Sequence, residues 1–142
     1  MTRQTASPAG PQLNDDEFYL GVLKPGFKIE KSKVEDWDPQ LMVEWELKQG
    51  ATIRDYISLR LGTATNGKPA KLRQLLNALA EKPKDAELWF DSDTLEWGYD
   101  MAPEAPAFAV LSEGMAVQFR GALRPAGKDG IRRYRIDGYR AA

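Results

Sequence analysis

The run IRRYRIDGYR, residues 131–140, places four arginines around two tyrosines near the end of this 142-residue sequence. Guanidinium groups attract phosphates and aromatic rings stack on bases, so the combination is typical of strands that hold single-stranded nucleic acid. A second such group occurs earlier, where Tyr56 stands between Arg54 and Arg60. The alternative is a solvated surface of little energetic consequence, in which the arginines pair with acids on neighbouring strands: Glu44, Glu46 and Asp137.

Further basic residues extend this candidate surface. Lys68, Lys71 and Arg73 stand at the start of a predicted helix, where they would either continue a phosphate path or form the wet face of the helix. The full set of candidate nucleic-acid-binding residues is Arg54, Tyr56, Arg60, Lys71, Arg120, Arg124, Arg133, Arg135 and Tyr139.

Cysteine and histidine are both absent, although hydrophobic (42%) and charged (29%) residues occur at ordinary globular levels. This excludes disulfides, thiolate nucleophiles and most zinc sites, and it removes the usual proton shuttle of neutral pH. We therefore expect a non-enzymatic protein with no cofactor and no metal site.

The segment LWFDSDTL is similar to the nucleophile motif of haloacid-dehalogenase-type phosphatases. Only 48 residues follow Thr94, too few for the α/β domain that completes such a site. A calcium-binding EF-hand loop needs glycine where this sequence has Glu96. We expect these aspartates to form a turn.

The net charge of −1 conceals an uneven distribution. Residues 83–113 contain eight acids and one lysine, a local charge of −7, whereas residues 114–142 contain seven bases and two acids, a local charge of +5. This predicts a surface that faces a polyanion and a separate acidic surface. The acidic segment contains Trp89 and Trp97, which suits a second interpretation, a module that binds a replication or recombination protein. Exposed tryptophans that stack on sugar rings are a third.

The first fourteen residues lack the apolar stretch of a secretory signal and predict a disordered tail (1–14), followed by one domain (15–142). No apolar run reaches the ~18 residues that a membrane-spanning helix needs. We expect a cytoplasmic protein that does not contact a membrane.

Alternating hydrophobic residues predict the first strands. One alternates through Phe18 and Leu20 and bends at Pro25–Gly26. Residues 41–47 and 52–61 predict a hairpin whose three-residue loop, 49–51, keeps both apolar faces together. In that register Leu47 pairs with Ile53, Glu46 with Arg54 and Glu44 with Tyr56. Only Asp55 interrupts the apolar row.

Leucines at helical spacing predict one amphipathic helix between Pro69 and Pro83: Leu72, Leu75, Leu76 and Leu79. Next, ELWF and LEWGY predict a short hairpin across DSDT, with a helical turn as the alternative for the second segment. MAPEAPA predicts a loop.

Two strands end the chain. In MAVQFRGALR, Gln118, Arg120 and Arg124 share the polar face. In the last run we assign Tyr134 and Ile136 inward, and Arg133, Arg135 and Tyr139 outward. A single β-bulge would reverse part of this assignment.

Three strands, a helix and two strands is the chain order of the OB-fold, a Greek-key barrel. We therefore predict a mainly β fold: a five-stranded OB-like Greek-key barrel with one amphipathic helix between the third and fourth strands, and an acidic insertion. The segments TIRDYISLRLG, GKPAKLRQLLNAL, GMAVQFRG and GIRRYRIDGY resemble phage-type OB-fold proteins akin to single-stranded-DNA-binding proteins. The resemblance covers roughly residues 16–140 and implies a barrel that holds single-stranded nucleic acid, in phage or bacterial replication or recombination.

Overall fold

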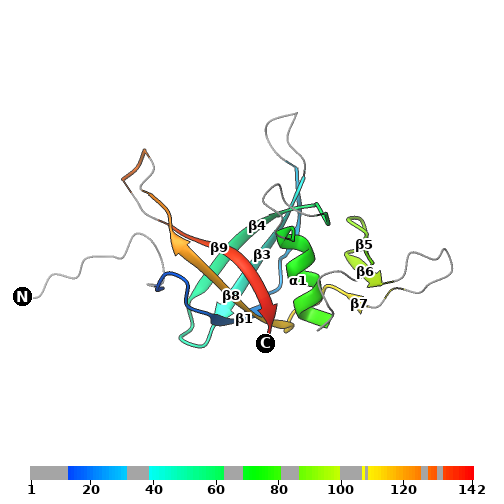
Figure 1. Ribbon diagram of the computed structural model, residues 1–142, viewed down its shortest axis with the longest axis horizontal. Helices are drawn as coiled ribbons and strands as arrows, with labels where there is room; N and C mark the ends of the chain where they lie inside the picture. Colours follow the sequence, from blue (N-terminus) through cyan, green and yellow to red (C-terminus); the bar gives the residue numbers. More distant parts are fainter. Residues whose placement is uncertain are drawn as a thin grey trace, which may run out of the picture.

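The computed structural model describes residues 13–31, 39–62, 69–80, 87–99, 107, 109–125, 128–130 and 133–142. They form a mainly β protein with one helix and two antiparallel sheets (Figure 1). Residues 1–12 of the predicted tail and residues 101–106 of MAPEAPA lie outside the described residues. Leu13, which we had assigned to the tail, is buried in the core. Within the described residues, no helix has the length and apolar character that crossing a membrane requires.

The larger sheet has six strands among the described residues: β1 (Tyr19–Leu23), β2 (Lys28–Glu30), β3 (Gln40–Leu47), β4 (Thr52–Ser58), β8 (Ala116–Leu123) and β9 (Tyr134–Ala141). β3 has β4 along one edge and both β1 and β2 along the other, and the sheet continues from β1 to β8 and β9. β1 and β2 are the two halves of the predicted bent strand. Gly26 at the bend has a φ of +100°, a conformation that glycine adopts without steric cost.

The outward face of β1 carries its apolar row. Leu20 is 48% exposed, whereas Gly21 is buried. A Cβ atom on Gly21 would lie 2.9 Å from the ring of Phe119 and 2.9 Å from Cβ of Trp45. Only glycine leaves room for these two large core side chains, so Gly21 occupies the inward position. Leu20 and Val22, on either side of it, therefore point to the outer face.

β3 and β4 form the predicted hairpin in a different register. Glu44 pairs with Arg54 instead of Tyr56, so the predicted register was wrong by two residues. The loop comprises residues 48–50, where Gly50 has a φ of +87°. A shift of two residues leaves each side chain on its predicted face, because the side-chain period of a strand is two.

A β-bulge in β9 reverses the end of that strand. Gly121 pairs with Ile136, while the preceding residue of β8 pairs with Gly138, so Asp137 is the additional residue. Beyond it Tyr139 faces the core and is only 7% exposed. The prediction that Tyr139 faces outward was therefore wrong. The assignments before the bulge are confirmed, with Tyr134 and Ile136 inward and Arg133 and Arg135 outward.

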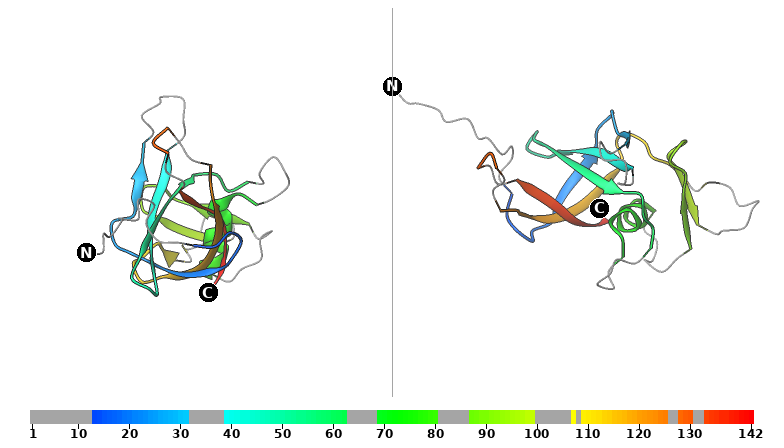
Figure 2. Two further views of the ribbon diagram at one scale, coloured as in Figure 1. Left: turned by 90° about the vertical axis from the view of Figure 1, so that its left-hand side faces the viewer. Right: turned by 90° about the horizontal axis from the view of Figure 1, so that it is seen from above.

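The helix α1 (Lys71–Ala80) packs against β4, β8 and β9 of the larger sheet and has the smaller sheet on its other side (Figure 2). Its buried leucines confirm the predicted amphipathic helix. The smaller sheet comprises β5 (Leu88–Phe90), β6 (Glu96–Tyr99) and β7 (Ala109–Val110). The pairing of β5 with β6 confirms the predicted hairpin, whereas β7 was not predicted. The Tyr99 hydroxyl lies 3.0 Å from Asn77 Oδ1, which joins this sheet to the helix.

Candidate nucleic-acid interface

Arg54 and Tyr56 lie on the outer face of β4, on either side of the inward-facing Asp55. The Arg54 guanidinium is 3.4 Å from the Tyr56 hydroxyl and 3.5 Å from a carboxylate oxygen of Glu44. Its pKa is raised, first by the hydrogen bond to Tyr56 and then by the charge of Glu44. Tyr56 is 41% exposed, and Arg60 is exposed just beyond the strand. β4 thus presents the Arg54 guanidinium and the accessible ring of Tyr56, but Glu44 partly neutralises the charge of Arg54.

Two residues of the predicted interface are instead part of the interior. Lys71 places its ammonium 2.9 Å from Oδ1 of Asp55 and 3.1 Å from the carbonyl oxygen of Ile136. Tyr139 donates a hydrogen bond of 2.6 Å to Oδ2 of Asp55 and accepts one of 3.0 Å from the indole of Trp45. Burial, and next the charge of Asp55, raise the pKa of Tyr139 well above its usual value. We therefore remove Lys71 and Tyr139 from the proposed contact surface.

This buried network connects β4 to β9. No backbone pairing joins β4 to β9 among the described residues, yet one ammonium, that of Lys71, contacts both strands. The side chains of Lys71, Asp55 and Tyr139 therefore connect β4 to β9. Arg54 precedes Asp55 and Arg135 precedes Ile136, and both arginines are exposed, so each of the two predicted basic strands turns an arginine outward beside a residue of this network.

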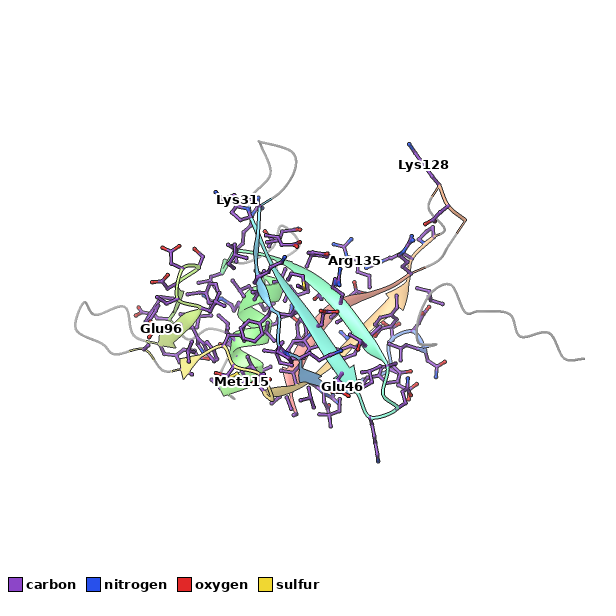
Figure 3. All side chains as sticks on the ribbon, turned by 180° about the vertical axis from the view of Figure 1, so that it is seen from behind. Lys31, Glu46, Glu96, Met115, Lys128 and Arg135 are labelled. Carbon is purple, nitrogen blue, oxygen red and sulfur yellow. The ribbon has the colours of Figure 1, made fainter. Side chains whose placement is uncertain are left out.

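The arginines of β9 and of the turn before it differ in their partners. Arg133 forms an ion pair of 2.6 Å with Asp129, which raises its pKa, and Arg124 contacts Asp137. Among the described residues, the guanidinium of Arg135 has no such partner. Figure 3 shows Arg135 on the side of the molecule that leads to Lys128, at the tip of the β8–β9 hairpin. The charge of Arg135 is therefore available to an anion.

A basic cluster that we did not predict lies further along the same strands. Arg140 lies over the ring of Phe18, with its guanidinium carbon 3.4 Å from the ring centroid, and Arg120 lies 5.5 Å from the same centroid. Arg120 was a predicted site residue, but Phe18 and Arg140 were not. The polar residues Gln118 and Arg120 indicated an outward face of β8. The sequence did not indicate that Phe18 points outward too, because its orientation depends on the burial of Gly21 three residues later.

The acidic insertion lies away from this surface. Asp91 holds the turn between β5 and β6, since its Oδ1 accepts a hydrogen bond of 2.8 Å from the amide of Asp93, in agreement with the predicted turn. Trp97 is 1% exposed, so Trp89 and Trp97 do not form an exposed pair that could stack on sugar rings. In Figure 3, Glu96 lies on the opposite side of the molecule from Lys128. Glu44, Asp137 and Asp129, which form ion pairs with Arg54, Arg124 and Arg133, come from outside this insertion.

A comparison with models of protein families and a search of curated proteins each found no match to this chain.

Proposed function

We propose that this protein binds single-stranded DNA without enzymatic activity and with little base specificity, as a phage or bacterial replication or recombination protein. The observation that carries the proposal is that Arg54 and Tyr56 of β4 and Arg135 of β9 are all exposed, on two strands that the contacts of Lys71 connect. Such a surface offers a ring for a base and guanidinium groups for phosphates. A base that stacks on a tyrosine contributes about 1–3 kcal/mol.

We further propose that the larger sheet is a five-stranded OB-like Greek-key barrel. If β1 and β2 count as one bent strand, the chain order is three strands, α1 and two strands, with the smaller sheet inserted after the helix. The order across the sheet, from β4 through β3, β1 and β8 to β9, is consistent with such a barrel. The side chains of Lys71, Asp55 and Tyr139 would then connect β4 to β9, where backbone hydrogen bonds would otherwise close the barrel.

The experiment is a fluorescence-anisotropy titration with a labelled oligo-dT, compared with duplex DNA and with RNA, at two salt concentrations. The wild-type protein should bind the single strand, and the slope of log affinity against log salt should be about −0.7 for each phosphate contacted. The Tyr56→Ala, Arg135→Ala double variant should lose binding. Lys48→Ala, which removes one charge from the exposed β3–β4 turn, is the matched control. Equal affinities of the double variant and the wild type contradict the proposal.

The second candidate is a protein-interaction module formed by the acidic insertion. The specific observation is Val110, which is 46% exposed on β7, at an edge of the smaller sheet. A replication or recombination partner held by an apolar contact there would dissociate little as salt is raised, whereas a nucleic acid dissociates steeply.

A further inference from the structure

A group of exposed residues from β8 and β9 surrounds one aromatic ring, that of Phe18. Antiparallel pairing puts Gln118 of β8 opposite both Leu20 of β1 and Arg140 of β9. Two residues further along β8, Arg120 lies beside Phe18, which directly precedes β1. One ring and two guanidinium groups are thus brought together, and we call Phe18, Arg120 and Arg140 the Phe18 cluster.

The guanidinium of Arg140 is held in a fixed orientation. It lies over the Phe18 ring at 3.4 Å from the centroid, and its Nε donates a hydrogen bond of 2.6 Å to Oε1 of Gln118. A stacked guanidinium keeps its terminal N–H groups in the plane, where they match two oxygens of a phosphate or carboxylate. Because the stack and the hydrogen bond already restrict the side chain, less conformational entropy remains to be lost on binding an anion.

The charge of the Phe18 cluster is not neutralised. Arg54, Arg124 and Arg133 each contact a carboxylate. Among the described residues, neither Arg120 nor Arg140 does. Two cations that approach one ring repel each other, and an anion between them removes that repulsion. Leu20, 48% exposed on the adjacent strand, adds an apolar surface next to this positive charge.

We infer that the Phe18 cluster binds a phosphodiester group of the same single strand that is proposed to cross Arg54, Tyr56 and Arg135. The inference rests on the proposed function and extends it to a second contact site. The two sites share β9, because Arg135 and Arg140 lie five positions apart on that strand. Because Asp137 is the additional residue of the bulge, this corresponds to four strand positions, roughly 13 Å at ~3.3 Å per residue, or about four nucleotides at the ~3.4 Å spacing of a stacked strand.

Oligonucleotide length distinguishes the two sites. The three phosphodiester groups of dT4 span about two nucleotide spacings, too few to contact both sites at once, whereas dT16 is long enough, at the upper end of the about 4 to 16 nucleotides that OB-folds bind. We expect the wild-type affinity to rise steeply from dT4 to dT16. In an Arg120→Gln, Arg140→Gln variant most of that rise should be lost, and the salt slope for dT16 should fall by about 0.7, for the one phosphate contact that is lost.

The controls separate geometry from charge and from folding. Arg140→Lys keeps the charge without the planar fork, so it should restore the salt slope but only part of the affinity. The thermal unfolding midpoint of each variant should equal that of the wild type, because both arginines are exposed.

The outcomes for the two proposals are distinct. If the double glutamine variant binds dT16 like the wild type while the Tyr56→Ala, Arg135→Ala variant does not bind, the second site is refuted and the proposed function stands. If the wild type binds neither oligonucleotide, both are refuted. Binding of a labelled polyglutamate peptide through the cluster, without binding of DNA, also overturns both and identifies an acidic protein segment as the ligand.

Discussion

Tyr139 of β9 donates a 2.6 Å hydrogen bond to the carboxylate of Asp55 on β4, and both residues are buried. This contact joins two strands between which no backbone pairing occurs among the described residues. Lys71 from the helix neutralises the same carboxylate at 2.9 Å. A polar network of side chains therefore joins β4 to β9, the two strands that carry the exposed Arg54 and Arg135.

Removal of the Tyr139 hydroxyl should destabilise the protein. Tyr139→Phe leaves Asp55 with one donor fewer and the Trp45 indole without its acceptor, and an unsatisfied buried group costs roughly 1–3 kcal/mol. Urea unfolding measures the difference. Tyr134→Phe is the matched control, because the buried Tyr134 hydroxyl has no hydrogen-bond partner among the described residues. Equal losses in the two variants would show that the network adds nothing.

Loss of the Lys71–Asp55 ion pair should destabilise the protein more than loss of the Tyr139 hydroxyl. In Lys71→Met the Asp55 carboxylate, whose side chain is 6% exposed, loses its counter-charge. Breaking a buried pair from one side costs about 3–5 kcal/mol at neutral pH. Chemical denaturation of Lys71→Met and of the wild type at neutral pH measures this loss, and equal free energies of unfolding would contradict the prediction.

Alkaline pH should weaken the fold through Tyr139. Its pKa is raised in the folded protein, first by burial, so between the unfolded value of 10.0 and the higher folded value the native state holds a proton that the unfolded state has released. The stabilisation is complete below pH 10 and declines as pH rises above it, by about 1.4 kcal/mol per pH unit for one group. Urea titrations at pH 9, 10 and 11 should show this decline, and Tyr139→Phe should be less steep than the wild type.

The β8–β9 pairing leaves no room for a side chain at Gly121. A Cβ atom there would lie 1.8 Å from the carbonyl oxygen of Arg135, which is backbone and cannot rotate away. Gly121→Ala should therefore cost about 3 kcal/mol or more and displace the strand that carries Arg135. Gly62→Ala is the control, since its Cβ would meet nothing within 4 Å. Thermal unfolding compares the two variants, and similar midpoints would contradict the close approach.

Local patterns in the sequence predicted most strands and the helix, because alternation and leucine spacing are properties of short segments. The patterns did not predict the bulge at Asp137, since a bulge depends on how two strands pair. For the same reason Tyr139 was assigned to the surface. Asp55 looked like an interruption of an apolar row, although it is the acceptor of the buried network, because its partners come from segments far along the chain.

Substitution of Glu44, the ion-pair partner of Arg54, should increase the affinity for single-stranded DNA. Glu44 lies 3.5 Å from the Arg54 guanidinium and competes with a phosphate for it. Glu44→Gln removes that competition, and because an exposed ion pair contributes about 0.2–1 kcal/mol, affinity for oligo-dT should rise by a factor of about 1.4 to 5. The salt slope should also steepen by up to about 0.7, as Arg54 becomes free to contact a phosphate.

The control for Glu44→Gln is Glu46→Gln, which removes the same charge from the same outer face of β3, two residues away. Among the described residues, Glu46 has no ion pair, so its substitution changes the overall charge without releasing an arginine. Anisotropy titrations of both variants at two salt concentrations distinguish the local effect from the general one. A larger gain for Glu44→Gln assigns Arg54 to the contact surface. Equal gains would attribute the effect to net charge, and no gain in either variant would remove β4 from the path of the nucleic acid.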